Sequence, residues 1–299
     1  MTNIHQHVIA QISGRIYGVA GYYSENDSTQ HVVVATNDGT LYEIHWNRDI
    51  APTAPQRLAQ FPGIASLSGF FTSDDDFQHV AIETEDGHLH ELYYTDPQHV
   101  HFRGPLLQIG ANAGPHIGMA GSYSTDDGLR HVVVGDIDNG LYEVVWNAQV
   151  APDLKLLATQ FTLPDVAAIA GFFDLSVHSQ DVVVAMKGGD VFDVYYSGGI
   201  VSSGGQTTTD RVTGFSPSLV NVAAFVSPDT HVRHIILLDS RGQVYDYSYI
   251  KDPAQLFGAT SLITLGNVID MVAYYSAYDR TNHVILATDD GQIHEVYYG

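Results

Sequence analysis

The sequence contains no cysteine among its 299 residues, which excludes disulfides, thiolate metal centres and a cysteine nucleophile. Basic side chains are scarce, with 12 Lys and Arg against 34 Asp and Glu, giving a formal charge of -22. This charge repels nucleic-acid phosphates and anionic membrane surfaces, so we expect neither as a partner. No apolar run reaches the roughly 18 residues that a spanning helix needs, so no membrane insertion is expected.

Targeting signals and catalytic fingerprints are also missing. The start of the chain lacks the basic region and apolar core of a secretory signal peptide. We therefore expect a cytoplasmic protein, or one exported without a recognisable signal. There is no P-loop, dinucleotide-binding or GxSxG pattern, and we expect no cofactor.

What the sequence does contain is one segment repeated six times. Each copy has an aliphatic strand of the type HVVVAT, a turn rich in Gly, Asn and Asp, and a strand of the type LYEIHW. The copies begin at His31, His79, His131, Asp181, His234 and His283, 48 to 53 residues apart. An acid follows twelve residues after each start, at Glu43, Glu91, Glu143, Asp193, Asp246 and Glu295. Such a period is typical of repeat architectures.

Each copy reads as four short strands with turn signals between them, and sustained helical periodicity is absent. We therefore predict an all-β fold, a six-bladed β-propeller of four-stranded antiparallel blades. The last copy stops after its third strand, so the N-terminal strand is expected to close the ring by joining that blade. The predicted single domain covers 1–299, with blades near 16–62, 63–112, 113–164, 165–216, 217–266, and 267–299 plus 1–15.

The loop length of the repeated hairpin decides which side chains share a face. A three-residue Asn-Asp-Gly loop ending in a left-handed glycine pairs Val33 with Glu43 and puts His31 on the same face as Glu43. A two-residue loop would put the acid on the opposite face. The Asn-Asp-Gly and Glu-Asp-Gly sequences favour the first arrangement.

The segment from His31 to Trp46 resembles the repeat of the fucose-binding β-propeller lectins of fungi and bacteria. That repeat runs Arg, aliphatic strand, turn with Gly, Glu, two residues, aromatic. The resemblance implies pockets between blades in which the acid and its partner hydrogen-bond sugar hydroxyls beneath an aromatic ring. It places the aromatic at Trp46, Tyr94, Trp146, Tyr196, Tyr249 and Tyr298. In this chain His, or Asp181, replaces the family's Arg, and the family's following Gly-Trp segment is absent, so fucose itself is not predicted.

The residues themselves allow two interpretations. Carboxylates and imidazoles bind hydroxyls and aromatic rings cover apolar sugar faces, while six similar sites would gain avidity. Alternatively the acids and histidines are structural, fixing each blade to its neighbour. The candidate ligand-binding residues are His31, Glu43, Trp46, His79, Glu91, Tyr94, His131, Glu143, Trp146, His234, Asp246, Tyr249, His283, Glu295 and Tyr298. Blade four, with Asp181 and Asp193, has two acids and no cationic or imidazole donor, and is expected to be inactive.

Other clusters lead to weaker expectations. Sixteen histidines include His88, His90, His99 and His101 in blade two, but their spacing is unspecific and we expect no metal site. Asp270 and Asn221 break the repeat on the innermost strands, beside a predicted aromatic collar of Tyr22, Phe70, Phe172, Phe225 and Tyr274. They are the candidate catalytic residues if the channel holds an active site.

We therefore expect a multivalent, lectin-like protein that binds carbohydrate or another small polyhydroxylated ligand between its blades. It is not expected to be an enzyme. The alternatives are an enzyme acting on a small molecule at one mouth of the channel, and an acidic protein-interaction scaffold.

Overall fold

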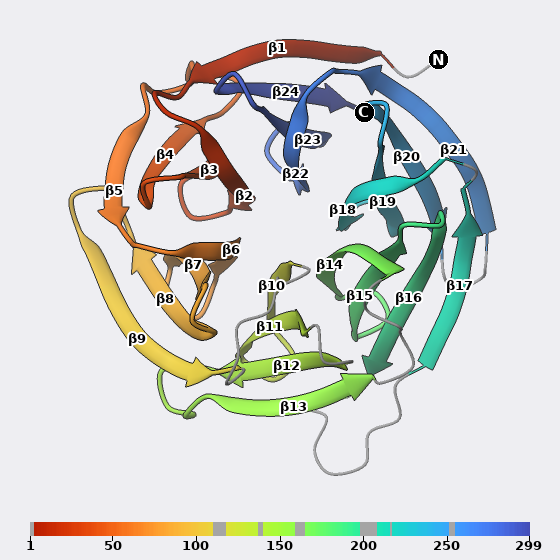
Figure 1. Cartoon of the computed structure of the whole chain (residues 1–299). Coiled ribbons are helices and arrows are strands. Elements are labelled where there is room, and N and C mark those ends of the chain that lie inside the picture. Colours follow the sequence, from red (N-terminus) through yellow and green to blue (C-terminus); the bar gives the residue numbers. More distant parts are fainter. Residues whose placement is uncertain are drawn as a thin grey trace.

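The computed structural model describes residues 3–109, 118–136, 140–158, 165–197, 208–215, 217–250 and 255–299. Six four-stranded antiparallel sheets are arranged in a ring around a central channel (Figure 1). The predicted all-β, six-bladed propeller is therefore confirmed. In this part of the chain, no helix is long and apolar enough to cross a lipid bilayer.

Each blade begins with the strand nearest the channel and ends with the strand at the rim. The strands of the first three blades are β2 (Ile16–Ser24), β3 (Thr29–Thr36), β4 (Thr40–Trp46) and β5 (Gln56–Gln60); β6 (Ile64–Thr72), β7 (Phe77–Thr84), β8 (His88–Tyr94) and β9 (Val100–Gln108); and β10 (Met119–Ser124), β11 (Leu129–Asp136), β12 (Gly140–Trp146) and β13 (Asp153–Ala158).

The other three blades repeat the pattern. They contain β14 (Val166–Asp174), β15 (Ser179–Met186), β16 (Asp190–Ser197) and β17 (Thr208–Gly214); β18 (Leu219–Ser227), β19 (Val232–Asp239), β20 (Gln243–Ile250) and β21 (Gln255–Thr264); and β22 (Val268–Ser276), β23 (Thr281–Thr288), β24 (Gln292–Tyr298) and β1 (Ile4–Gln11). The N-terminal strand β1 pairs with β24, so the ring closes as the sequence predicts (Figure 1).

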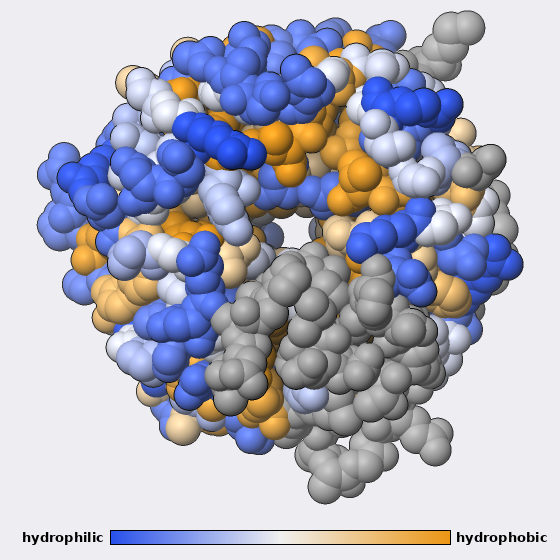
Figure 2. Space-filling view, in the orientation of Figure 1, coloured by the Kyte–Doolittle hydropathy of each residue, from blue (hydrophilic) through white to orange (hydrophobic). Residues whose placement is uncertain are grey.

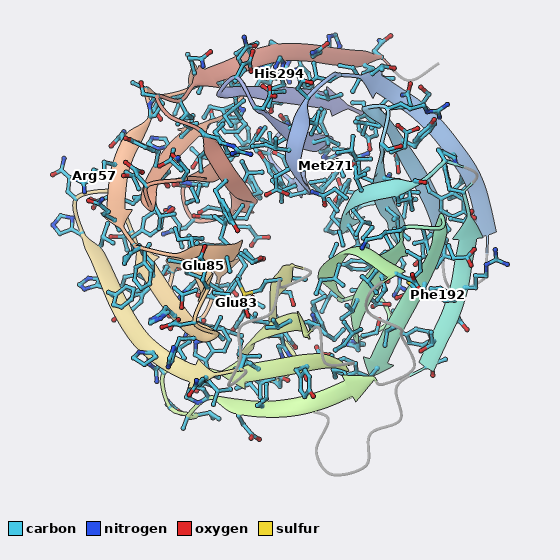
Figure 3. The ribbon with its side chains drawn as sticks, in the orientation of Figure 1. Arg57, Glu83, Glu85, Phe192, Met271 and His294 are labelled. Carbon is cyan, nitrogen blue, oxygen red and sulfur yellow. The ribbon has the colours of Figure 1, made fainter. Side chains whose placement is uncertain are left out.

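The hydrophobic core lies mainly between the blades. The second strand of each blade is almost fully buried, as in β3, where Val32, Val33 and Val34 have no exposed surface. Side chains fill the space between neighbouring sheets and leave the centre of the ring open (Figure 3). Blades approach most closely near the channel, where a Cβ on Gly18 would lie 2.8 Å from Leu67 of the next blade. The repeated small residues of the inner strands therefore allow six blades to meet around one axis.

Candidate functional site: the interfaces between blades

The β3–β4 hairpin has the predicted three-residue loop. Val33 pairs with Glu43 and His31 with His45, and Gly39 has a φ of 79°, in the left-handed region that the loop requires. The histidine and the acid of the repeat therefore share one face of the blade. In five blades the imidazole Nδ1 lies at hydrogen-bond distance from the carboxylate: His31–Glu43 2.8 Å, His79–Glu91 2.9 Å, His131–Glu143 2.7 Å, His234–Asp246 2.9 Å and His283–Glu295 2.7 Å.

A second carboxylate, which the sequence analysis missed, lies at the other nitrogen of four of these rings. It belongs to an aspartate four residues before the histidine, in the turn that precedes the second strand. The pairs are Asp27–His31, Asp75–His79, Asp127–His131 and Asp279–His283, with Nε2 to oxygen distances of 3.2 to 3.4 Å. The recurrence of Asp at this spacing was the available signal. An imidazole between two acids is best satisfied when both nitrogens carry protons.

Blades one and three illustrate the electrostatic consequences of these contacts. Burial alone lowers the pKa of His131, but its hydrogen bonds to Asp127 and Glu143 raise that pKa to about 9. The pKa of His31 is raised by the same balance of effects. Burial would raise the pKa of Glu43, but the hydrogen bond from His31 and the charge of that ring lower it to about 2. In blade one, Glu43 and His31 are therefore an ion pair near neutral pH.

Each acid also meets an aromatic side chain from the following blade. Trp46 donates its indole N–H to Glu295 at 3.1 Å, and the hydroxyls of Tyr249 and Tyr298 donate to Asp193 at 3.0 Å and Asp246 at 2.9 Å. Tyr196 donates to Glu143. Tyr94 and Trp146 lie beside Glu43 and Glu91, but the hydroxyl of Tyr94 is hydrogen-bonded to that of Tyr22 at 2.9 Å, and the indole N–H of Trp146 makes no hydrogen bond within the described residues. The repeated aromatic thus links the blades in a closed ring.

The predicted aromatic collar forms part of the same arrangement. Rings from the innermost strands stack on the imidazoles, with centroid distances of 5.3 Å for Tyr22–His31, 5.5 Å for Phe70–His79, 4.8 Å for Phe225–His234 and 5.6 Å for Tyr274–His283. In blade four, Phe172 instead packs against a guanidinium 5.5 Å from its centroid. The collar therefore packs over the imidazole and guanidinium groups that donate hydrogen bonds to the acids. It also borders the channel.

The fifteen predicted ligand-binding residues all lie in these interfaces, and each has only 0 to 7 % of its surface exposed. The structure brings them together as the sequence analysis expected. The carboxylates, however, already accept hydrogen bonds from protein donors. A ligand at an interface would therefore first meet the surrounding, more exposed atoms, and direct contact with the six acids stays a prediction.

Blade four corrects one expectation. Its Asp181 and Asp193 do not lack a cationic donor, because Arg233 reaches across from β19 of blade five. The guanidinium is fully buried and lies 2.6 Å from Asp181, 3.1 Å from Asp193 and 2.8 Å from a third acid, Asp174. Burial opposes the charge, but the neighbouring carboxylates raise the pKa of Arg233 overall. The donor comes from another blade, so comparing positions within one blade did not reveal it.

A small cavity opens into the interface between blades three and four. It is lined by Ser124, Asp127 and His131 of blade three and by Phe173, His178, Gln180 and Tyr196 of blade four. Its volume is about 10 Å³, which matches a single water or hydroxyl group. Gln180 Oε1 is a buried acceptor that makes no hydrogen bond within the described residues, and Asp127 Oδ2 is held only by its ion pair with His131 Nε2 at 3.2 Å. The cavity therefore offers acceptors to a hydroxyl-sized donor.

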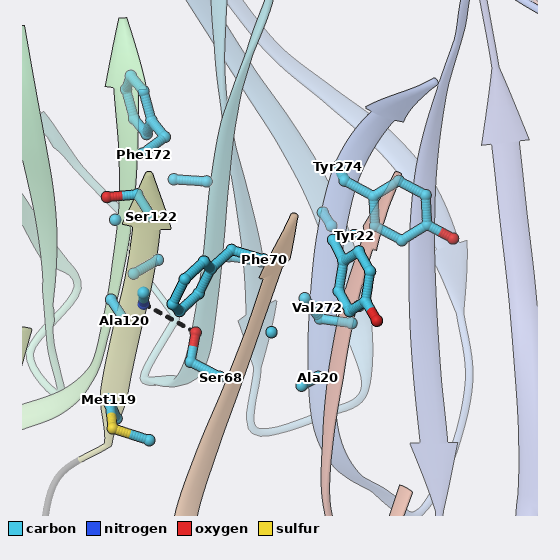
Figure 4. A pocket seen from close by; sticks show the side chains of 18 of the residues that line it. Ala20, Tyr22, Ser68, Phe70, Met119, Ala120, Ser122, Phe172, Val272 and Tyr274 are labelled. Atoms are coloured by element: carbon cyan, nitrogen blue, oxygen red, sulfur yellow. Dashed lines mark hydrogen bonds between the residues drawn. The ribbon is translucent and has the colours of Figure 1, made fainter. Parts of the chain in front are cut away.

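The central channel is a much larger cavity of about 660 Å³, visible through the ring in Figure 2 and lined by the six innermost strands. Small, aliphatic and aromatic residues line its wall, and the hydroxyl of Ser68 accepts a 2.8 Å hydrogen bond from the Gly121 N–H (Figure 4). Asp270 and Asn221 lie on this wall as expected.

Both oxygens of Asp270 accept hydrogen bonds within the inner ring. The N–H of Val19 donates to one oxygen at 2.7 Å, while the N–H of Met271 and the Asn221 amide donate to the other, each at 2.8 Å. Burial raises the pKa of Asp270, and this effect outweighs that of the hydrogen bonds, which lower the pKa. Asp270 therefore ties three innermost strands together, and a catalytic role for it and Asn221 stays a prediction.

Comparisons with known proteins agree on the fold. No family model matches the chain, and no curated protein is significantly similar in sequence. A mutant of AofleA from Arthrobotrys oligospora superposes with a TM-score of 0.74 at 12 % identity, covering 100 % of this chain and 87 % of that one. The BP39L lectin from Burkholderia pseudomallei superposes with a TM-score of 0.62 at 17 % identity, covering 93 % of this chain and 80 % of that one.

A mutant of the lectin of Aleuria aurantia, in complex with α-methyl-L-fucoside, gives a TM-score of 0.67 at 10 % identity, covering 97 % of this chain and 92 % of that one. Its structure is described as a six-bladed β-propeller with a novel fucose recognition mode. The likeness extends over nearly the whole length of both chains. The protein therefore has the six-bladed propeller fold of the fucose-binding lectins.

Proposed function

We propose that this protein binds carbohydrate in the clefts between adjacent blades. The observation that carries the proposal is the cleft between blades three and four. There a hydroxyl-sized cavity reaches Asp127 and the buried Gln180, and the ring of Phe173 lies beside it. A sugar hydroxyl can donate to these acceptors while an apolar face of the sugar covers the aromatic ring. The fold shared with fucose-binding lectins supports this ligand class.

In this proposal the acid–histidine pairs shape the cleft. His131 and Tyr196 line the cavity, whereas Glu143 lies behind them and accepts hydrogen bonds from both. The acid fixes the imidazole and the phenol in position. Because both side chains are held by a buried partner, the edges that border the cavity are preorganised for a ligand, which reduces the entropic cost of binding.

The six clefts are not equivalent, because the residue before each repeat histidine differs. This position projects toward the preceding blade and is occupied by Gln30, Gln78, Arg130, Gln180, Arg233 and Asn282. Arg130 forms an ion pair with Asp75, and Arg233 binds three acids of blade four. These guanidiniums fill the clefts between blades two and three and between blades four and five. The protein is therefore expected to offer up to four sites per chain.

A glycan array tests the ligand class, and calorimetry with the best glycan tests the site. We expect Phe173→Ala and Gln180→Ala each to remove about one binding equivalent per chain. The matched control is Phe102→Ala, because Phe102 is 49 % exposed on the outer strand β9 and does not line the cavity between blades three and four. Circular dichroism establishes that each variant is folded. The proposal is refuted if no glycan binds, or if Phe173→Ala and Phe102→Ala bind it equally.

A further inference from the structure

Blade one departs from the repeat two residues after its acid. This position is occupied by Tyr93, Tyr195 and Tyr297 in blades two, four and six, and by Val145 and Ser248 in blades three and five. In blades two and six the tyrosine ring stacks on the repeat histidine, at 6.0 and 5.9 Å. Blade one instead has His45, whose ring lies 5.6 Å from that of His31. The fold therefore accommodates an aromatic ring at this position. In blade one that ring is an imidazole, which carries two nitrogen atoms.

The extra imidazole faces the acid. His45 Nδ1 lies 3.7 Å from Glu43 Oε2, while His31 Nδ1 lies 2.8 Å from the other oxygen, Oε1. The donor atoms of the three residues all lie within 4.8 Å of one another. Glu43 Oε2 and His45 Nδ1 are both buried, and neither makes a hydrogen bond within the described residues. The two atoms thus face each other at 3.7 Å, too far apart for a hydrogen bond, which is costly unless something binds both.

We infer that His31, Glu43 and His45 bind a divalent first-row transition metal, with Zn²⁺ the preferred ion. Two imidazoles and a carboxylate are a common ligand set for such ions, and no thiolate is available in this chain. Bonds of about 2.0–2.1 Å in a tetrahedral site place neighbouring ligand atoms about 3.3 Å apart. The 3.7 Å between His45 and Glu43 needs only a small inward movement to reach that spacing.

The surroundings of His31 supply the outer contacts that such a ligand needs. Its Nε2 lies 3.2 Å from Asp27 Oδ2 and 2.6 Å from Thr29 Oγ1. A metal-binding histidine commonly donates its second N–H to a carboxylate, which fixes the tautomer and the ring orientation. The metal takes Nδ1, the proton there is released to solvent, and the proton on Nε2 stays directed at Asp27.

Charge and access also fit. Glu43 and Asp27 together carry two negative charges, which a divalent cation neutralises when both imidazoles are neutral. The net charge of -22 also favours a cation. Glu43 is 1 % exposed, whereas the side chain of His45 is 27 % exposed and gives an ion and its remaining water ligand a path to solvent. In blade six the second oxygen of Glu295 is already paired with His7 at 3.0 Å.

Calorimetric titration of chelator-treated full-length protein with ZnCl₂ tests this site. We expect one tight equivalent in the wild type and at least a 100-fold weaker affinity in His45→Tyr, which has the residue of blades two, four and six. Asp27→Asn should weaken binding by about 10- to 100-fold through the outer contact. The control is the double variant His99→Ala and His101→Ala, which removes one exposed histidine of β9 and one from the turn before it, and should keep the tight equivalent.

Visible absorption of the Co²⁺-loaded protein provides an independent readout, because its bands report coordination number and donor type. The wild type should show the intense bands of a four- or five-coordinate site, and His45→Tyr should lack them. The inference is overturned if the wild type takes up no tight equivalent, if His45→Tyr retains it, or if the double variant at His99 and His101 loses it. These outcomes are independent of glycan binding, so the metal site and the proposed function can fail separately.

Discussion

Replacing Arg233 by Gln tests how the blades are held together. Gln is the residue that precedes the repeat position in blades one, two and four, so the shape of the site allows it. The substitution leaves Asp174, Asp181 and Asp193 buried without their shared cation. Arg233 is fully buried and contacts these acids at 2.6 to 3.1 Å. Removing one partner of a buried ion pair costs about 3–5 kcal/mol.

The upper part of that range is expected for Arg233→Gln, because one guanidinium serves three acids. Each pair contributes about 4 kcal/mol of Coulomb energy at 4 Å and an effective dielectric constant of 20, before desolvation is subtracted. Urea unfolding at pH 7 should therefore show a free energy of unfolding lower by about 3–5 kcal/mol. The deficit should shrink as the pH falls, since protonation of the acids removes their repulsion.

A compensated variant separates lost charge balance from lost packing. The triple substitution Asp174→Ser, Asp181→His and Arg233→Gln gives blade four the residues that blades one and three have at the first two positions. It should recover most of the stability lost in Arg233→Gln, because the imidazole then pairs with Asp193 within the blade. The reasoning is refuted if Arg233→Gln lies within about 1 kcal/mol of the wild type, the range of ordinary surface changes. It is also refuted if the triple variant is no more stable than Arg233→Gln.

Three further predictions concern the same interfaces. The pKa of His131 is raised from 6.5 to about 9, so its protonated ring stabilises the fold below pH 6.5 and this contribution is lost as the pH rises through 9. Urea unfolding should show that decline in the wild type and a smaller one in His131→Asn; equal slopes would contradict it. Tyr298→Phe removes a hydrogen-bond donor to Asp246 and should lower the free energy of unfolding by about 1–3 kcal/mol. An unchanged thermal unfolding midpoint would contradict this prediction. Gly69→Ala places a Cβ 2.8 Å from the Tyr22 ring and should cost about 1–3 kcal/mol; a neutral effect would show that the ring can move freely.

The sequence predicted the features that depend on one blade at a time. The six copies and their turn residues predicted the four-stranded sheets and the closure by β1. The Asn-Asp-Gly loop predicted the register that puts His31 and Glu43 on one face, and the structure confirms it. These features follow from local strand and turn chemistry, which repeats with the sequence.

Features that depend on two blades could not be predicted in this way. Arg233 satisfies acids some fifty residues earlier, and Trp46 reaches Glu295 at the other end of the chain. A single copy gives no sign of which neighbour a side chain faces or whether a cleft is open. The sequence did contain one usable signal, the aspartate four residues before four of the histidines, because its recurrence parallels that of the acid.

The most direct test of the account is the number of glycan molecules bound per chain. Calorimetric titration of the folded protein with the best glycan from an array gives this stoichiometry. Binding in the clefts between blades predicts more than one and at most four equivalents, because Arg130 and Arg233 close two of the six clefts. A single equivalent, or no binding to any glycan, would contradict it.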